Sequence, residues 1–124
     1  MSQNFSDWEF DCNCGGCVHP PVPSELYLMC EFVRLLCGGL PISFSSAYRC
    51  PKWNASEGGS IHSFHLRMMA VDIRVPGFMI DDIYEKLCRL FPNTYGFGKY
   101  DTFIHVDIDP TKSRRWDLTE ENTW

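Results

Sequence analysis

Three residues of this sequence have the types and the spacing of an open zinc site: His65, Asp72 and His105. Zinc accepts imidazole nitrogen and carboxylate oxygen, and catalytic zinc sites keep three protein ligands and leave the fourth position for water. The ion lowers the pKa of that water to roughly 7 and polarises the carbonyl that the water attacks. The set therefore indicates a hydrolase, although His-x6-Asp is a loose pattern that scattered surface residues also produce.

Asp72 and His105 each lie in a segment that alternates apolar and polar residues. In residues 70–75 and 103–108 the β-branched residues share one face of a strand, so Asp72 and His105 project from the other face. If the two strands pair antiparallel with Asp72 opposite His105, their Cβ atoms lie about 5 Å apart, and both side chains can bind one ion. His65, in the polar turn before the first strand, can supply the third ligand.

Two amphipathic helices should support this sheet. Ser24 can cap a helix over residues 25–37, and Gly38 and Gly39 can end it. Apolar residues at helical spacing predict a second helix over residues 79–91. The sequence therefore predicts an α+β fold, with a small antiparallel sheet that carries the zinc site and packs against two main helices.

The remaining segments complete the predicted sheet. A strand at residues 42–47 precedes a polar loop at 51–63, whose Gly, Asn and Ser content suits a loop that faces a substrate. A final hairpin follows the second helix, with strands at residues 95–99 and 102–108.

Length and charge limit the classes to which this protein can belong. The 124 residues fit one domain, residues 1–124, with a short C-terminal tail at about 110–124. A net charge of −5 argues against a nucleic-acid partner. No apolar run approaches the roughly 20 residues of a membrane span, and the N-terminus lacks the features of a signal peptide. We therefore expect a monomer without a membrane span that is cytoplasmic as synthesised.

Three of the seven cysteines, Cys12, Cys14 and Cys17, cluster in a Cys-rich N-terminal segment at about residues 10–20. One interpretation is a structural metal site closed by Cys50, since four thiolates satisfy tetrahedral zinc. The other is a disulfide from this cluster to Cys50. Both give these cysteines a structural role.

Several segments together resemble a known family. Residues 63–73 (SFHLRMMAVDI), 95–100 (YGFGKY) and 103–107 (FIHVD) are similar to the metal-binding segments of the zinc D-alanyl-D-alanine peptidases of the lysostaphin, carboxypeptidase and hedgehog superfamily. Residues 45–51 (SSAYRCP) are similar to the Ser-Gly-Tyr-Arg segment of that family. The resemblance runs from about residue 10 to residue 116.

The resemblance implies a hedgehog-like peptidase fold with one catalytic Zn²⁺ held by His65, Asp72 and His105. It implies a metallopeptidase that hydrolyses peptide bonds in peptidoglycan stem peptides or cross-links, as a carboxypeptidase or an endopeptidase. Such an enzyme acts on the cell wall or in the periplasm, and without a signal peptide it reaches that place by delivery or lysis, as phage-encoded endolysins do.

The resemblance also implies roles for residues outside the metal set. An arginine can form two parallel hydrogen bonds with a carboxylate, so we expect Arg49 to orient the substrate and to stabilise the developing oxyanion. The expected substrate-binding residues are Arg49, Asn54, Ser63 and Tyr100.

The position of the general base departs from the pattern of the family. Relatives often place an acid or histidine two or three residues before the last ligand, where this chain has Phe103 and Thr102. We therefore expect Asp101 to act as the base and Asp107 to orient His105 from behind, with Asp107 or His62 as the alternative base.

Met68 is a second departure, because the family usually has Gly at this position and the turn must form without a residue that tolerates positive φ. These departures keep two other functions open. One is a catalytically silent, zinc-stabilised module that binds cell-wall peptide or a protein. The other is a structural Cys-rich zinc protein, which leaves the two patterned strands unexplained.

Overall fold

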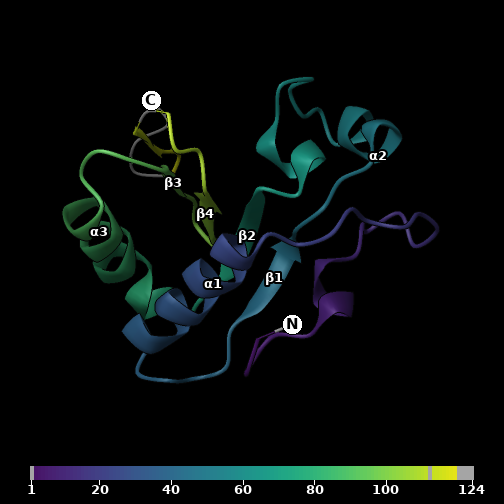
Figure 1. Cartoon of the computed structure of the whole chain (residues 1–124). Helices are drawn as coiled ribbons and strands as arrows, with labels where there is room; N and C mark the ends of the chain where they lie inside the picture. Colours follow the sequence, from purple (N-terminus) through teal and green to yellow (C-terminus); the bar gives the residue numbers. More distant parts are fainter. Residues whose placement is uncertain (1, 112, 120–124) are drawn as a thin grey trace.

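A computed structural model of the chain describes residues 2–111 and 113–119. Within these residues a single sheet has the strand order β1-β2-β4-β3-β5. The strands are β1 (Ser43–Ser46), β2 (Ala70–Arg74), β3 (Gly96–Lys99), β4 (Ile104–Asp107) and β5 (Arg114–Asp117). The helices are α1 (Ser24–Leu36), α2 (Pro51–Ser56) and α3 (Ile80–Leu90), and short 3-10 turns occur at η1 (Asp7–Phe10), η2 (Phe64–Arg67) and η3 (Gly77–Met79) (Figure 1). The predicted α+β class is confirmed.

The central strands pair in the register that the alternation predicted. β2 is antiparallel to β4, with Asp72 opposite His105. β3 and β4 form the predicted hairpin, and β1 is antiparallel to β2. Because Val71 and Ile73 are fully buried on the other face of β2, the pair Asp72–His105 is held on the face away from the core.

The C-terminal part of the sheet differs from expectation. β5 lies in the segment predicted as a tail and runs parallel to β3, so the sheet is mixed rather than wholly antiparallel. Arg114 pairs with Gly96 and Trp116 with Gly98 in this register. Residues 112 and 120–124 of the predicted tail lie outside the described residues.

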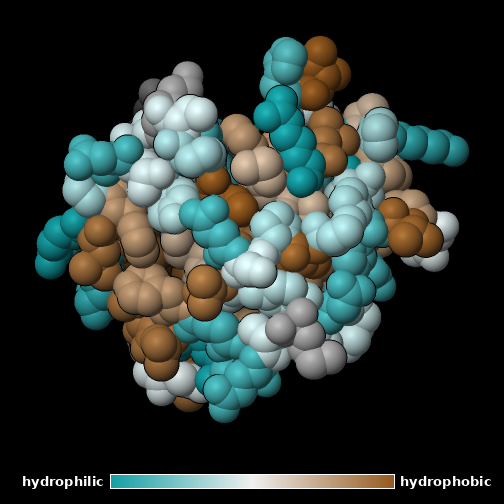
Figure 2. Space-filling view, in the orientation of Figure 1, coloured by the Kyte–Doolittle hydropathy of each residue, from teal (hydrophilic) through white to brown (hydrophobic). Residues whose placement is uncertain are grey.

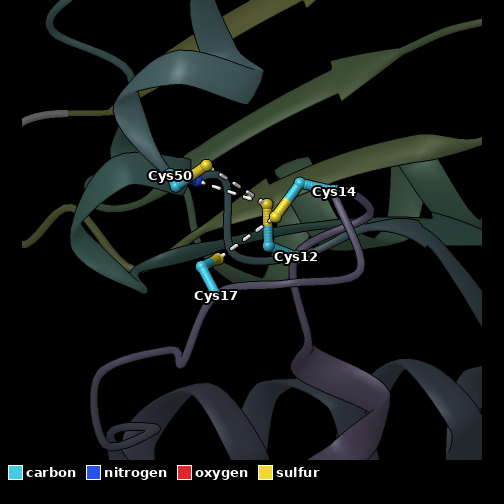
Figure 3. A group of neighbouring side chains, drawn as sticks. All are labelled: Cys12, Cys14, Cys17 and Cys50. Atoms are coloured by element: carbon cyan, nitrogen blue, oxygen red, sulfur yellow. Dashed lines mark hydrogen bonds between the residues drawn. The ribbon is translucent and has the colours of Figure 1, made fainter.

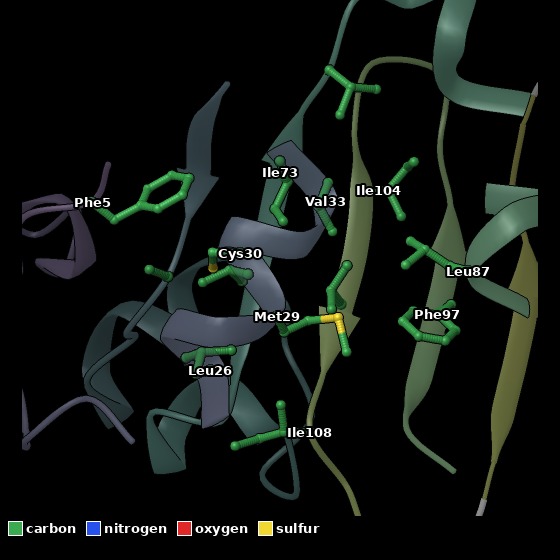
Figure 4. Close-up of a cluster of buried hydrophobic side chains, with 14 of the residues drawn as sticks. Phe5, Leu26, Met29, Cys30, Val33, Ile73, Leu87, Phe97, Ile104 and Ile108 are labelled. Atoms are coloured by element: carbon green, nitrogen blue, oxygen red, sulfur yellow. The ribbon is translucent and has the colours of Figure 1, made fainter. Parts of the chain in front are cut away.

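The hydrophobic core lies between the sheet and the helices α1 and α3. Val33 of α1 and Leu87 of α3 belong to the same buried cluster as Ile73, Ile104 and Phe97 of the sheet. Figure 4 shows these side chains meeting in one layer. Burial of such side chains contributes about 1.5–3 kcal/mol each, which makes this layer the main support of the sheet.

Two helical predictions need correction. Pro23, not Ser24, occupies the N-cap position of α1, and Ser24 begins the helix without a capping hydrogen bond from the preceding side chain. The region 51–63, predicted as a loop, contains the helix α2, which begins with Pro51 at its first position. Proline suits that position because its fixed φ is helical and the missing N–H has no partner there.

Met68 ends η2 in the left-handed region, with φ 57° and ψ 36°, and its side chain is fully buried. The turn before β2 therefore adopts a conformation with positive φ, which the sequence analysis had not expected of a residue other than glycine. Packing of the Met68 side chain offsets the backbone cost, which is roughly 1–2 kcal/mol for a residue with a Cβ.

The surface mixes apolar and hydrophilic residues. Leu28 and Leu35 of α1 and Leu90 of α3 remain exposed, and Figure 2 shows brown apolar residues among teal hydrophilic ones on the face that carries these helices. Among the described residues, no helix has the length and apolarity needed to cross a bilayer.

Candidate metal centre

His65, Asp72 and His105 converge on one point from three elements, η2, β2 and β4. One nitrogen or oxygen atom of each lies within 4.8 Å of the others. Asp72 Oδ1 is 3.3 Å from His65 Nε2 and 3.0 Å from His105 Nδ1. His65 is 2% exposed and Asp72 4% exposed, and His105 is half-buried.

The hydrogen bonds of His65 leave one ring nitrogen for a metal. Nδ1 lies 2.7 Å from the carbonyl oxygen of Ala47. A carbonyl can only accept, so Nδ1 carries the proton and Nε2 is the basic nitrogen. Nε2 is buried, makes no hydrogen bond and faces Asp72. A buried, unpaired nitrogen beside a carboxylate and a second imidazole is what a metal site requires, and the donor set suits zinc.

His105 is held from behind in the same way. Its Nε2 lies 2.8 Å from Asp107 Oδ2, while Nδ1 points toward Asp72. Asp107 is fully buried and also accepts a hydrogen bond from Arg114 Nη2. A carboxylate on the far nitrogen fixes the ring orientation and tautomer of a metal-binding histidine. Asp107, expected from the sequence to orient His105, contacts the ring nitrogen that faces away from Asp72.

The charges in the group stabilise each other. Burial alone would raise the pKa of Asp72, but the hydrogen bond with His105 and the nearness of both imidazoles outweigh it, and the pKa lies below its usual range. Burial alone would lower the pKa of His105, but hydrogen bonds to Asp107 and Asp72 raise it. Asp72 is therefore ionised, the state in which a carboxylate binds a metal.

Arg49 contacts the group directly. Its Nη2 donates to Asp72 Oδ2 at 3.2 Å, Nε donates to Ser46 Oγ at 3.0 Å, and Nη1 donates to Asn54 Oδ1 at 3.4 Å. These bonds use three of the five N–H groups of a guanidinium. The side chain is partly exposed and lines a cleft, so the remaining N–H groups can face a ligand.

The cleft over the group has a volume of about 710 Å³. Tyr100 and Phe103 line it from the β3–β4 turn, and Arg114 and Trp116 line it from β5. Sequence reasoning missed Arg114 and Trp116 because it assigned them to a tail. Arg114 and Trp116 occupy alternate positions of β5, a pattern that indicates a strand, although the strand has only four residues.

Trp116 forms one wall of the cleft. Its ring lies 5.0 Å from that of His105, and its Nε1 donates to the hydroxyl of Tyr100 at 3.0 Å. A Cβ on Gly98 would stand 2.2 Å from Trp116 Cε2, so glycine at this position lets the indole lie across β3. Tyr100, predicted to bind substrate, is thereby held at the cleft.

The other predicted substrate-binding residues divide into two groups. Ser63 lines the cleft and caps η2, since its Oγ accepts from the backbone N–H of His65 at 3.2 Å. Asn54 is 2% exposed and does not line the cleft. Its side chain bonds Arg49 and the carbonyl of Ser60, so it positions Arg49.

The residues considered as general base occupy different places. Asp101 is exposed in the β3–β4 turn and is not among the residues that line the cleft. Asp107 is buried behind His105. His62 lines the cleft and is exposed. Asp109 also lines it, but its carboxylate accepts hydrogen bonds from Thr111 and Arg114.

The four cysteines expected to have a structural role form a separate cluster, with Cys50 next to Arg49 in the chain.

Comparison with known proteins gives one family. The family model described as Peptidase M15 matches residues 3–107, most of the chain. The match contains the three candidate ligands and ends at Asp107, so β5 with Arg114 and Trp116 lies beyond it. None of the curated proteins searched matches the chain.

Proposed function

Because the chain belongs to the Peptidase M15 family, a family of zinc-dependent peptidases, we propose that it hydrolyses peptide bonds in peptidoglycan stem peptides or cross-links. The observation that carries the proposal is the buried, unpaired Nε2 of His65, which faces the Asp72 carboxylate beside His105. In this proposal His65, Asp72 and His105 hold one zinc ion. The cell wall is then the place of action.

Zinc bound by these residues supplies an activated water and polarises the substrate carbonyl. The chain prepares the site before any ligand binds, because Ala47 and Asp107 fix the rings of His65 and His105. Burial of Asp72 limits the access of bulk water to the ligands.

Arg49 has two roles in this proposal. Through Nη2 it holds Asp72, and through its remaining N–H groups it binds the substrate carbonyl or carboxylate. A guanidinium that is partly buried stabilises negative charge on an oxygen more strongly than one in bulk water. Asn54 and Ser46 keep the Arg49 side chain in this orientation.

The cleft chemistry favours a peptide that carries carboxylates. Arg49 and Arg114 line the cleft together with Asp72 and Asp109, with which they are paired, and the remaining N–H groups of the arginines can receive a carboxylate. Aromatic side chains of Tyr100, Phe103 and Trp116 add apolar surface for aliphatic parts of the peptide. Stem peptides present both features. If the carboxylate bound in the cleft is the C-terminal one of the substrate, the enzyme acts as a carboxypeptidase. If that carboxylate is not terminal, the enzyme acts as an endopeptidase.

Proton transfer requires an acceptor that faces the cleft. We assign this role to His62, which lines the cleft, in preference to Asp101, the residue expected from the sequence. Imidazole is the side chain that most often acts as acid or base in enzymes. Asp101 can take the role only if the turn between β3 and β4 changes conformation when substrate binds.

The direct test is incubation of the zinc-loaded protein with peptidoglycan sacculi and identification of released fragments by mass spectrometry. We expect fragments with new termini inside the stem peptide or the cross-link, and none from His105→Ala. His19→Ala is the matched control, since His19 bonds Asp7 and Pro20 away from the cleft. Binding of the zinc-loaded protein to sacculi without any release would overturn the peptidase proposal and support the silent binding module.

A further inference from the structure

Four cysteine sulfurs meet at a second place in the molecule. Cys12, Cys14 and Cys17 belong to the N-terminal segment and Cys50 to the N-terminus of α2, 33 residues after the last of them, and Figure 3 shows the four side chains pointing toward one another. The four sulfurs lie within 4.8 Å of one another. Cys12 Sγ is 3.8 Å from Cys50 Sγ, and Cys14 Sγ is 3.4 Å from Cys17 Sγ.

These separations suit a tetrahedral thiolate site. A zinc–sulfur distance of about 2.3 Å places two sulfurs of a tetrahedron about 3.8 Å apart. Both measured pairs are close to that edge, and the remaining distances are compatible with small rotations of the side chains. Cys14 and Cys17 also have the Cys-x2-Cys spacing of structural zinc sites.

The backbone around the cluster is arranged for negatively charged sulfur. The N–H of Cys50 points to Cys12 Sγ at 3.4 Å, and the N–H of Gly16 points to Cys14 Sγ at 3.5 Å. Gly15, with φ +76°, gives the chain the turn that brings Cys14 and Cys17 to the same side. Such N–H groups behind thiolates are a common support of metal-bound sulfur.

We propose that Cys12, Cys14, Cys17 and Cys50 bind a structural zinc ion, separate from the group formed by His65, Asp72 and His105. A metal uses all four sulfurs at once, whereas disulfides would use them as two independent pairs. A zinc ion with four thiolates carries a charge of −2, and Lys52 lines the same hollow and offsets part of it. The proposal does not depend on the peptidase activity.

The ion connects the N-terminal segment to the part of the chain that carries Arg49. Besides the bond from Cys50 N–H to Cys12 Sγ, two hydrogen bonds link these parts: Tyr48 N donates to the carbonyl of Phe10 at 3.2 Å, and Asn13 Nδ2 donates to the carbonyl of Ser45 at 2.9 Å. Zinc at Cys50 adds a link directly after Arg49. The ion therefore stabilises the position of the segment that leads from β1 to α2.

Zinc stoichiometry tests the proposal. Elemental analysis of protein purified under reducing conditions should give two zinc ions per chain, one in the double variant Cys14→Ser/Cys17→Ser, and one in His65→Ala/His105→Ala. Cys88→Ser is the matched control, because Cys88 lies on α3 outside the cluster, and it should keep both ions. Unchanged zinc content in the double cysteine variant would overturn the proposal.

Cobalt gives a readout that needs no variant. The apoprotein loaded with Co²⁺ should show the sulfur-to-cobalt charge-transfer band and the intense visible bands of a tetrahedral thiolate site, and a mercurial reagent should abolish them. A spectrum without sulfur charge transfer would contradict the proposal. Finding Cys14–Cys17 and Cys12–Cys50 disulfides by mass spectrometry in that reduced, purified protein would contradict it as well.

Discussion

Arg49 Nη2 donates a hydrogen bond to Asp72 Oδ2 at 3.2 Å, so the arginine expected to bind substrate also holds one of the three candidate metal ligands. The two residues come from segments on either side of η2 and meet beside His65. In the proposed function, binding of a substrate by Arg49 is thereby coupled to the orientation of Asp72. This coupling distinguishes Arg49 from an arginine that contacts substrate alone.

Replacement of Arg49 by lysine should lower kcat/KM about 100-fold, because lysine keeps the charge but cannot bond Asp72, Ser46 and a substrate at the same time. The control is Arg74→Lys, at the exposed end of β2, which should leave kcat/KM unchanged. Steady-state kinetics on a stem peptide measure both. Equal rates for Arg49→Lys and the control would contradict the assigned role.

Replacement of Asp107 by asparagine should weaken zinc binding about 10–100-fold, since the amide supports the His105 ring less well than a carboxylate and removes one of the two carboxylates paired with Arg114. Competition with a zinc chelator measures the affinity. Asp82→Asn, an exposed change on α3, is the control. Wild-type zinc affinity in Asp107→Asn would show that the contact with His105 is incidental.

The part of the site that lies on β2 and β4 could be predicted from sequence because two β-branched faces allow only one orientation of Asp72 and His105 relative to the core. Their register follows from the same patterning, and the structure has it. The two long helices were predictable for the analogous reason, since each buries a stripe of apolar residues at helical spacing.

The contributions of β5 and α2 could not be predicted in the same way. β5 has four half-buried residues, Arg114, Arg115, Trp116 and Asp117, and pairs in parallel with β3, from which β4 separates it in the chain. Its sequence alone is that of a charged tail. The bonds that place Asn54 behind Arg49 depend on the packing of α2, and local patterns contain no information about them.

The proton acceptor can be identified by two parallel substitutions. His62→Gln should reduce kcat by about 100-fold or more with zinc content unchanged. Asp101→Asn should keep most of its activity, because His62 lines the cleft and Asp101 does not. Rates on the same peptide and elemental analysis of both variants provide the comparison. The reverse result, an inactive Asp101→Asn with an active His62→Gln, would return the role to Asp101 and require movement of the β3–β4 turn.

The left-handed conformation of Met68 predicts an unusual order of stabilities. Met68→Ala and Met68→Gly should both destabilise the fold by about 2–5 kcal/mol, because a fully buried side chain is lost. The glycine variant should be the more stable of the two by about 1 kcal/mol, since glycine has no Cβ penalty at φ 57°.

Met29, buried in the helix α1, provides the matched pair for this comparison. There, alanine should be more stable than glycine by about 1 kcal/mol, the usual helical order. Denaturant unfolding of the four variants measures both differences. The same order at both positions would mean that Met68 does not adopt the left-handed conformation in solution.

The central claim is that hydrolysis depends on a metal held by His65, Asp72 and His105. The most direct measurement is the rate of fragment release from sacculi by chelator-treated protein before and after zinc is restored, for the wild type and for His105→Ala. We expect no release by the metal-free wild type, full recovery with zinc, and no recovery in His105→Ala while the protein remains folded. Release at the wild-type rate by the metal-free protein, or by His105→Ala, would contradict it.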